Sequence, residues 1–141
     1  MFLYKGKGDF DTRALQKTLS LYPSLTSEVT ALEYLNGKNQ VWYDGEGNFN
    51  LLTWNGEGVY TAHYFFPTKR GRAALDMVKA GLKAVFVDND EIQVLRGLTP
   101  VTQRGAIWMN RQLGFKSYGT VEDGERSYEI FILTKKEYLG E

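Results

Sequence analysis

The chain of 141 residues contains no cysteine and only one histidine. The absence of cysteine excludes disulfide bonds, thiolate metal sites and a cysteine nucleophile, and it fits a reducing compartment. One histidine without cysteine partners is also too few for the usual zinc-type ligand sets. We therefore expect no metal site in this protein.

Long apolar runs and an excess of charge are absent as well. The first residues lack the apolar run of a signal peptide, and no segment approaches the length of a membrane span. Seventeen basic and seventeen acidic residues cancel, so the chain has no overall field that would attract nucleic acid or anionic lipid. We expect a soluble, cytoplasmic protein with no membrane partner, and the balanced charge argues against nucleic-acid binding.

The composition that remains is that of a globular protein. Hydrophobic residues make up 43% and aromatic residues 14% of the chain, enough for a buried core. No repeat, low-complexity tract or linker divides the sequence. We therefore expect one domain that spans residues 1–141.

Local patterns predict an alternation of helices and strands. Apolar side chains at helical spacing and capping residues predict helices at Thr12–Tyr22, Thr26–Leu35, about Gly71–Val85 and Thr102–Leu113. β-rich runs between glycine-containing turns predict strands at Gln40–Tyr43, Asn48–Trp54, Val59–Phe66, Ile92–Leu98, Lys116–Val121 and Tyr128–Thr134. This order predicts an α/β fold with one mixed, mostly antiparallel central sheet flanked by helices.

Side chains of the predicted strands and turns have ordinary structural interpretations. The aromatic residues of the segment Val59–Phe66 are expected in the sheet core, because aromatic side chains pack well on strands. Asp44 and Glu57 lie in predicted turns, where a solvated carboxylate is the usual case.

The junction between the strand Val59–Phe66 and the following helix carries a cluster of cations around a glycine. Lys69, Arg70 and Arg72 place three cations within four residues, and Gly71 would allow a close backbone approach. The N-terminus of a helix presents unpaired N–H groups and a positive dipole end, so the junction can bind an anion such as a phosphate. The alternative is a basic, solvated first turn of an ordinary amphipathic helix.

This junction resembles the pyrophosphate-binding motif of GNAT acetyltransferases, Arg/Gln-x-x-Gly-x-Gly/Ala. Gly71 and Ala73 match the glycine and the final small residue, whereas Thr68 replaces the first Arg or Gln. The resemblance implies that backbone amides here cradle the pyrophosphate of coenzyme A. Lys69 or Arg70 would then supply the missing charge.

A second GNAT motif follows about 40 residues later. The segment Gln103–Phe115 resembles Asn-x-x-Ala-x-x-x-Tyr-x-x-x-Gly-Phe, with Ala106 and the ending Leu113-Gly114-Phe115 in register. The two motifs at this distance, with a helix and a strand between them, indicate the acyl-coenzyme-A-binding half of a GNAT-like fold. The resemblance implies acetyl-CoA or coenzyme A as the cofactor. It implies as cofactor-binding residues Phe65 and Phe66, through their backbone groups, and Lys69, Arg70, Gly71, Arg72, Ala73 and Ala74.

The catalytic positions of the family are altered. The tyrosine that protonates the departing thiolate in many members is Asn110 here. An amide cannot act as an acid, but it can still donate a hydrogen bond to the sulfur, so Asn110 and His63 are the catalytic candidates. The strand that often carries a carboxylate base offers His63 instead, which can accept a proton from an amine near neutral pH. The alternative for His63 is a hydrogen-bonded, half-buried histidine of the sheet, the commoner case for a lone histidine.

Two functions follow from the resemblance and its departures. The first is an acyl-CoA-dependent N-acetyltransferase with degenerate motifs, which acts on a small-molecule or protein amine. The second is a non-catalytic GNAT-fold protein. The compact chain and reduced motifs are similar to acetyltransferase-like proteins of tailed bacteriophages, which implies a head-assembly or virion role with phage structural proteins as partners in the host cytoplasm.

Overall fold

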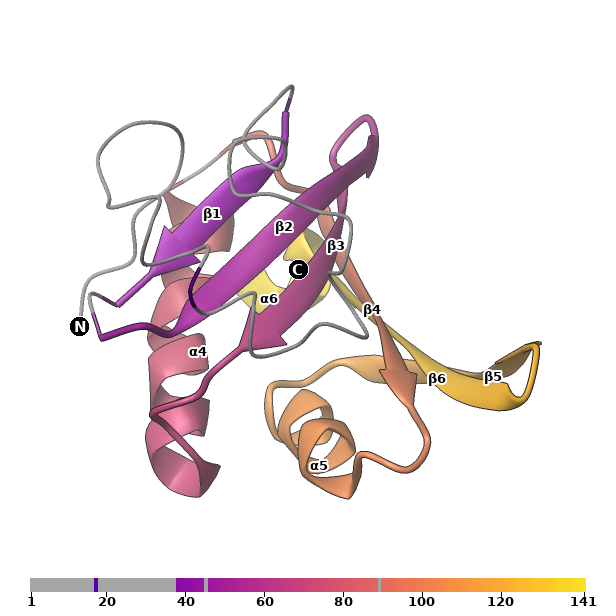
Figure 1. Ribbon diagram of the computed structural model, residues 1–141. Coiled ribbons are helices and arrows are strands. Elements are labelled where there is room, and N and C mark those ends of the chain that lie inside the picture. Colours follow the sequence, from indigo (N-terminus) through magenta and orange to yellow (C-terminus); the bar gives the residue numbers. More distant parts are fainter. Residues whose placement is uncertain (1–16, 18–37, 45, 89) are drawn as a thin grey trace.

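The computed structural model describes residues 17, 38–44, 46–88 and 90–141 (Figure 1). Apart from Lys17, the helices predicted at Thr12–Tyr22 and Thr26–Leu35 lie outside the described residues. The remaining predicted helices and strands are all present, with ends that differ by a few residues.

The strands form one sheet in the order β1-β2-β3-β4-β6-β5. They comprise β1 (Gln40–Tyr43), β2 (Phe49–Gly56), β3 (Val59–Phe65), β4 (Val94–Pro100), β5 (Lys116–Asp123) and β6 (Arg126–Thr134). The neighbours β3 and β4 are parallel, and the other four neighbouring pairs are antiparallel. This topology confirms the predicted mixed, mostly antiparallel sheet.

Three helices are described: α4 (Gly71–Val87), α5 (Arg104–Gln112) and α6 (Lys135–Leu139). The sequence analysis did not predict α6. Thr134 accepts a hydrogen bond from the N–H of Glu137, and the Glu137 side chain accepts one from the N–H of Thr134. The start of α6 could have been predicted from the sequence, since the pattern Ser/Thr-x-x-Glu is typical of a capping box at a helix start.

The core lies between the sheet and α4, which Figure 1 shows behind β1 and β2. Alternate strand residues such as Tyr60 and Leu95 point toward α4, because successive side chains of a strand face opposite sides. We call this side of the sheet the α4 face and the other side the opposite face. The α4 side of the core consists of Ala74, Leu75, Met77, Val78, Leu82, Val85 and Phe86, which confirms the predicted apolar stripe.

The start of β4 differs from the prediction. The N–H groups of Gln93 and Val94 both donate to the carbonyl of Gly58, at 2.8 and 2.9 Å. They join β4 to the turn before β3, so β4 begins at Val94 and not at Ile92. Ile92 is nevertheless fully buried in the core. No described helix is long and apolar enough to cross a membrane.

Candidate functional site

The segment between β3 and α4 is held by a side chain from the β1–β2 turn. The amide of Asn48 accepts from the N–H of Thr68 at 3.1 Å and donates to its hydroxyl at 2.5 Å. The same hydroxyl donates to the carbonyl of Glu46 at 3.2 Å. Thr68, which stands where the GNAT motif has Arg or Gln, is therefore an anchor for the backbone that leads into α4.

A buried carboxylate reinforces this anchor. The Asp44 side chain is fully buried; it accepts from Lys69 Nζ at 2.7 Å and from Asn48 Nδ2 at 2.8 Å. Burial acts to raise the pKa of Asp44, but hydrogen bonds from Lys69, Asn48 and two backbone N–H groups outweigh it and lower the pKa. The expectation of a solvated Asp44 is therefore wrong, because the turn folds back over the carboxylate.

The three cationic side chains of this segment, Lys69, Arg70 and Arg72, differ in their partners. Lys69 pairs with Asp44 and, at 3.1 Å, with Glu46. Arg70 donates to the carbonyl of Phe66 and so folds back on the chain. Arg72 is exposed, and no partner for its side chain occurs among the described residues. Of the three, Arg72 has its charge available for a ligand in the arrangement observed.

The start of α4 has the features of an anion cradle. Gly71, its first residue, has φ of 56°, and a Cβ placed there would meet nothing within 4 Å. No side chain caps the helix, and its first turn carries no acidic residue. The N–H of Ala74 already donates to the carbonyl of Arg70 at 3.5 Å. The N–H groups of Gly71, Arg72 and Ala73 have no acceptor among the described residues, so they remain for a ligand and fit a pyrophosphate.

Beside this cradle, β3 and β4 separate. They pair through Val59 with Val94, Tyr60 with Leu95 and Thr61 with Arg96, after which each strand continues without the other. In Figure 1 the arrowheads of β3 and β4 point apart, above α4 and α5. We call the point where they part, after Thr61 and Arg96, the β3–β4 fork. Beyond it, β3 continues to Phe65 without pairing to β4.

The aromatic side chains of β3 lie where the sequence analysis placed them. Tyr60, Phe65 and Phe66 are buried, and Tyr64 packs against Phe66 with ring centroids 5.5 Å apart. Burial also raises the pKa of Tyr64 far above its ordinary value, so its phenol stays neutral. These rings are core residues, and Phe65 and Phe66 can contact a ligand at the fork only through their backbone groups.

His63 lies on β3, beyond the fork and on the opposite face of the sheet. Its side chain is exposed, and the described residues give it no hydrogen bond. The surrounding protein partly desolvates the imidazole, which lowers the pKa of His63 below its ordinary value. His63 is therefore neutral at pH 7 and able to accept a proton. Both the role as a base and the structural alternative for His63 stay predictions.

Asn110 lies in α5 and is buried, with 4% of its surface exposed. Its Nδ2 donates to the hydroxyl of Thr99 in β4 at 3.0 Å. Thr99 is two residues beyond Gly97 on the α4 face, so this bond ties α5 to β4 just past the fork. Asn110 thus occupies the tyrosine position of the GNAT motif as a link between two elements.

The ending Leu113-Gly114-Phe115 closes α5 in a Schellman motif. The N–H of Phe115 donates to the carbonyl of Asn110 at 3.0 Å, and that of Gly114 to Arg111 at 3.1 Å. Gly114 has φ of 90°, and Leu113 and Phe115 are buried. This part of the second motif therefore stops a helix and anchors it in the core.

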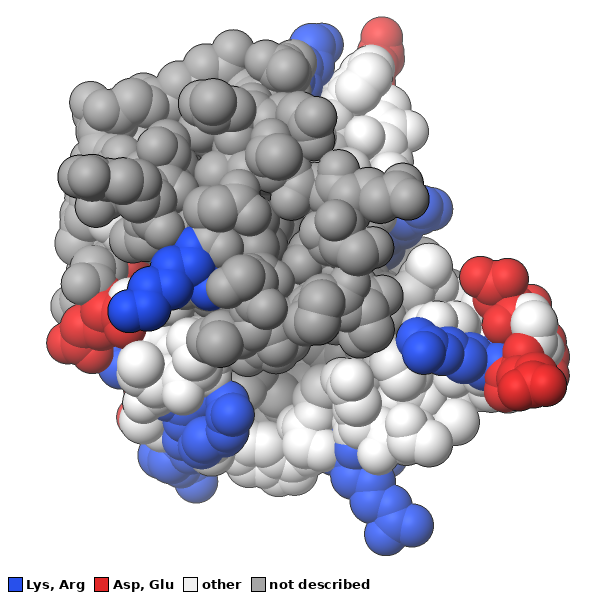
Figure 2. Space-filling view, in the orientation of Figure 1, with Lys and Arg blue, Asp and Glu red and all other residues white. Residues whose placement is uncertain are grey.

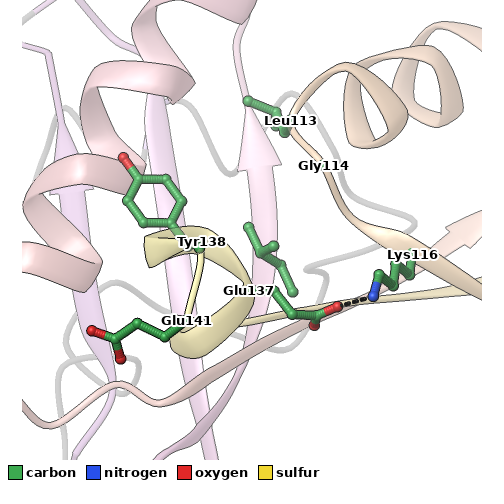
Figure 3. A pocket seen from close by; sticks show the side chains of 8 residues that line it. Leu113, Gly114, Lys116, Glu137, Tyr138 and Glu141 are labelled. Carbon is green, nitrogen blue, oxygen red and sulfur yellow. Dashed lines mark ion pairs between the residues drawn. The ribbon is translucent and has the colours of Figure 1, made fainter.

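A separate shallow depression of about 530 Å³ lies beside α6 (Figure 3). Lys116 and Glu137 form an ion pair at its rim, and Tyr138 turns inward, where its ring packs against Phe86 at 5.1 Å. None of the predicted site residues lines this depression. We therefore place the candidate site at the start of α4 and the β3–β4 fork.

The distribution of surface charge agrees with a site for an anionic ligand at the start of α4 and the β3–β4 fork. Figure 2 shows basic side chains along the lower edge, where Figure 1 places α4 and α5, and acidic side chains at the far tip of the β5–β6 hairpin. The hairpin tip includes Glu122, Asp123 and Glu125. The described residues contain no group of histidine and acidic side chains able to hold a metal ion.

The structure adds residues that the sequence analysis missed. Asn48 and Asp44 hold the segment before α4, and Thr99 holds Asn110. Arg96 lies at the fork, where its Nε donates to the Thr61 hydroxyl at 3.0 Å. Asp44 at a turn start was a readable signal for a local hydrogen-bonded turn, but nothing in the sequence marked the other partners.

Comparisons with known proteins bear on the fold. No protein-family model matches the chain, and no curated protein sequence matches it. A chimera of the spermidine N-acetyltransferase SpeG from Vibrio cholerae and hSSAT is similar in structure, with a TM-score of 0.74, 13% identity and coverage of 100% of both chains. A mutant of SpeG from Vibrio cholerae gives 0.77 at 13% identity over 99% of this chain and 98% of that one.

A GNAT-family acetyltransferase from Bacillus anthracis is similar too, with a TM-score of 0.64 and 15% identity over 96% of this chain and 99% of that one. At such identities the likeness concerns the fold alone. It confirms the GNAT-like fold predicted from the sequence. It does not support a phage origin, which stays a prediction.

Proposed function

We propose that this GNAT-fold protein is an N-acyltransferase that uses acyl-coenzyme A as donor and an amine as acceptor. The observation that carries the proposal is the uncapped start of α4 beside the β3–β4 fork. Gly71, Arg72 and Ala73 would hold the pyrophosphate, and the pantetheine arm would lie at the β3–β4 fork, where the two strands no longer pair. Both lie within one continuous stretch of the chain.

Coenzyme A supplies the acyl group as a thioester, whose carbonyl carbon the amine attacks to form a C–N bond while the C–S bond breaks. His63 would accept the proton that the amine nitrogen loses, because its imidazole is neutral at pH 7. Asn110 would not protonate the leaving thiolate, since an amide is no acid and its Nδ2 is bonded to Thr99. The thiolate would take its proton from water.

A non-catalytic role is the second candidate, and the buried Asn110 favours it. With no acid at that position, the fold can serve as a coenzyme-A-binding or assembly module. Phage head or virion proteins are the partners that the sequence resemblance implies for such a module. This candidate needs no turnover.

Calorimetry with coenzyme A, followed by an acetylation assay with acetyl-CoA and a panel of amines, tests both candidates. Spermidine belongs in the panel, because similar folds occur in spermidine N-acetyltransferases. We expect binding that weakens in Gly71→Ala and turnover that falls in His63→Gln. Binding without turnover of any amine would favour the second candidate, and absence of binding would refute the first.

A further inference from the structure

Arg96 is a cation whose side chain is anchored by a hydrogen bond and has no counter-ion among the described residues. Its Nε donates to the hydroxyl of Thr61 at 3.0 Å, and that hydroxyl in turn donates to the side-chain oxygen of Asn55. Thr61 is buried, with 7% of its surface exposed, so the anchor is fixed. No carboxylate pairs with Arg96 in the described part of the chain. Within the described part of the chain its other guanidinium N–H groups have no acceptor, so they can bind an anion.

Arg96 and His63 lie on the same face of the sheet. Thr61 and His63 are two residues apart on β3, so both point to the same side, and Arg96 is the neighbour of Thr61 on β4. Tyr60 and Leu95, which alternate with them, pack in the core against α4. His63 and Arg96 therefore lie on the opposite face, on either side of the fork.

The α4 face of the sheet is occupied by helices. α4 covers it through the core, and α5 is tied to it by the bond between Asn110 and Thr99. A donor bound at the start of α4 reaches the fork from that side. An acceptor amine can then approach from the opposite face, where His63 and Arg96 are exposed.

We propose that the acceptor is an amine that also carries a carboxylate, such as an amino acid, and that Arg96 binds this carboxylate. A guanidinium with free N–H groups matches a carboxylate in shape and charge. It would repel a polycation such as spermidine. Arg96 is thus a specificity-determining residue of the proposed site, and this inference rests on the proposed acyl transfer.

The first test compares matched acceptors. Glycine and glycinamide differ in the carboxylate, and their kcat/KM values are compared at equal concentrations of free amine, with spermidine as the cationic acceptor. We expect glycine to exceed glycinamide by about 10-fold or more, the size of one charge-assisted hydrogen bond. Arg96→Gln should bring this ratio close to one. Arg126→Gln, which changes an exposed arginine at the start of β6, should leave it unchanged.

A second test reads the same site without turnover. His63 is the only histidine, so its imidazole gives one set of NMR signals. With coenzyme A present, N-acetylglycine should shift these signals saturably, N-acetylglycinamide should not, and Arg96→Gln should abolish the shift.

A preference for spermidine that Arg96→Gln does not alter would overturn the carboxylate proposal and leave acyl transfer intact. If no amine is acetylated, the NMR result decides: a shift that depends on Arg96 supports the carboxylate site, and its absence overturns it. Loss of coenzyme A binding in calorimetry would instead refute the proposed function itself.

Discussion

The start of α4 and the end of α5 both carry a glycine at positive φ, yet the two glycines have different surroundings. At Gly71 the backbone N–H groups of the first turn are left without a capping side chain. At Gly114 the neighbouring N–H groups are used in the Schellman motif, and the flanking Leu113 and Phe115 are buried. One glycine lies at a surface that a ligand can reach, and the other ends a helix.

The two motifs therefore differ in what they indicate about function. The ending Leu113-Gly114-Phe115 has a full structural explanation, so it indicates the fold and says nothing about activity. At the segment around Gly71 the N–H groups of the first turn have neither a partner in the helix nor a capping side chain. The first motif therefore carries the functional proposal, and the second supports only the scaffold.

The largest expected effect concerns a group at neither helix end. If the start of α4 binds the acyl donor and α5 only supports the scaffold, His63 is the residue that accepts the proton from the amine. We expect His63→Gln to lower kcat by about 100-fold, the lower range for loss of a general base, with little change in stability because the side chain is exposed. Steady-state kinetics and thermal unfolding check this.

The pH dependence sharpens the same prediction. His63 must be neutral to act, and desolvation lowers its pKa, so kcat/KM should rise with pH through a value below the ordinary one for histidine. His63→Gln should lose that step. A step that persists in the variant would assign it to another group.

Next in size is the anchor of the α4 start. Asp44→Asn removes a buried acceptor of four hydrogen bonds, and we expect the free energy of unfolding to fall by about 2 kcal/mol. Glu46→Gln, which changes an exposed partner of Lys69, is the control and should change it by less than about 0.5 kcal/mol. Urea unfolding measures both.

The lowered pKa of Asp44 fixes the sign of the pH effect. A carboxyl group whose pKa is lower in the folded state stabilises the protein above the unfolded pKa, about 4. This contribution is lost as the pH falls through the folded value. The stability difference between the native protein and Asp44→Asn should therefore shrink below pH of about 4.

The two glycines are compared directly by alanine substitution. Each alanine adds a Cβ at positive φ and should cost about 1–2 kcal/mol of stability. Gly71→Ala should also weaken coenzyme A binding by about 10-fold, because the methyl group enters the cradle. Gly114→Ala should leave the affinity unchanged. Equal losses of affinity in calorimetry would abolish the distinction between the two helix ends.

The smallest effect is that of the link between α5 and β4. Asn110→Ala and Thr99→Val remove the two sides of one buried hydrogen bond. A double-mutant cycle should give a coupling energy of about 1 kcal/mol with unchanged coenzyme A affinity. A large loss of turnover in Thr99→Val would instead show that this link acts in the reaction.

Much of the fold could be predicted from the sequence because it depends on local patterns of apolar residues and turn residues. Periodicity predicted α4 and its buried stripe, and glycine-rich turns predicted β1, β2 and β3. The start of β4 was placed two residues early, since the bonds from Gln93 and Val94 to Gly58 join distant parts of the chain. α6 was missed although its capping box was present.

For the candidate site, the cationic, glycine-containing start of α4 could be predicted from the sequence, because residues that are neighbours in the chain are also neighbours there in space. Which of its charges remain available for a ligand depends on contacts between distant segments. It paired Lys69 with Asp44, 25 residues away, and Arg96 with Thr61, 35 residues away. Such pairs depend on strand register and on how turns pack, which arise only when distant segments meet. For that reason Lys69 is bound to Asp44 and Glu46, while Arg72 and Arg96 have no carboxylate partner among the described residues.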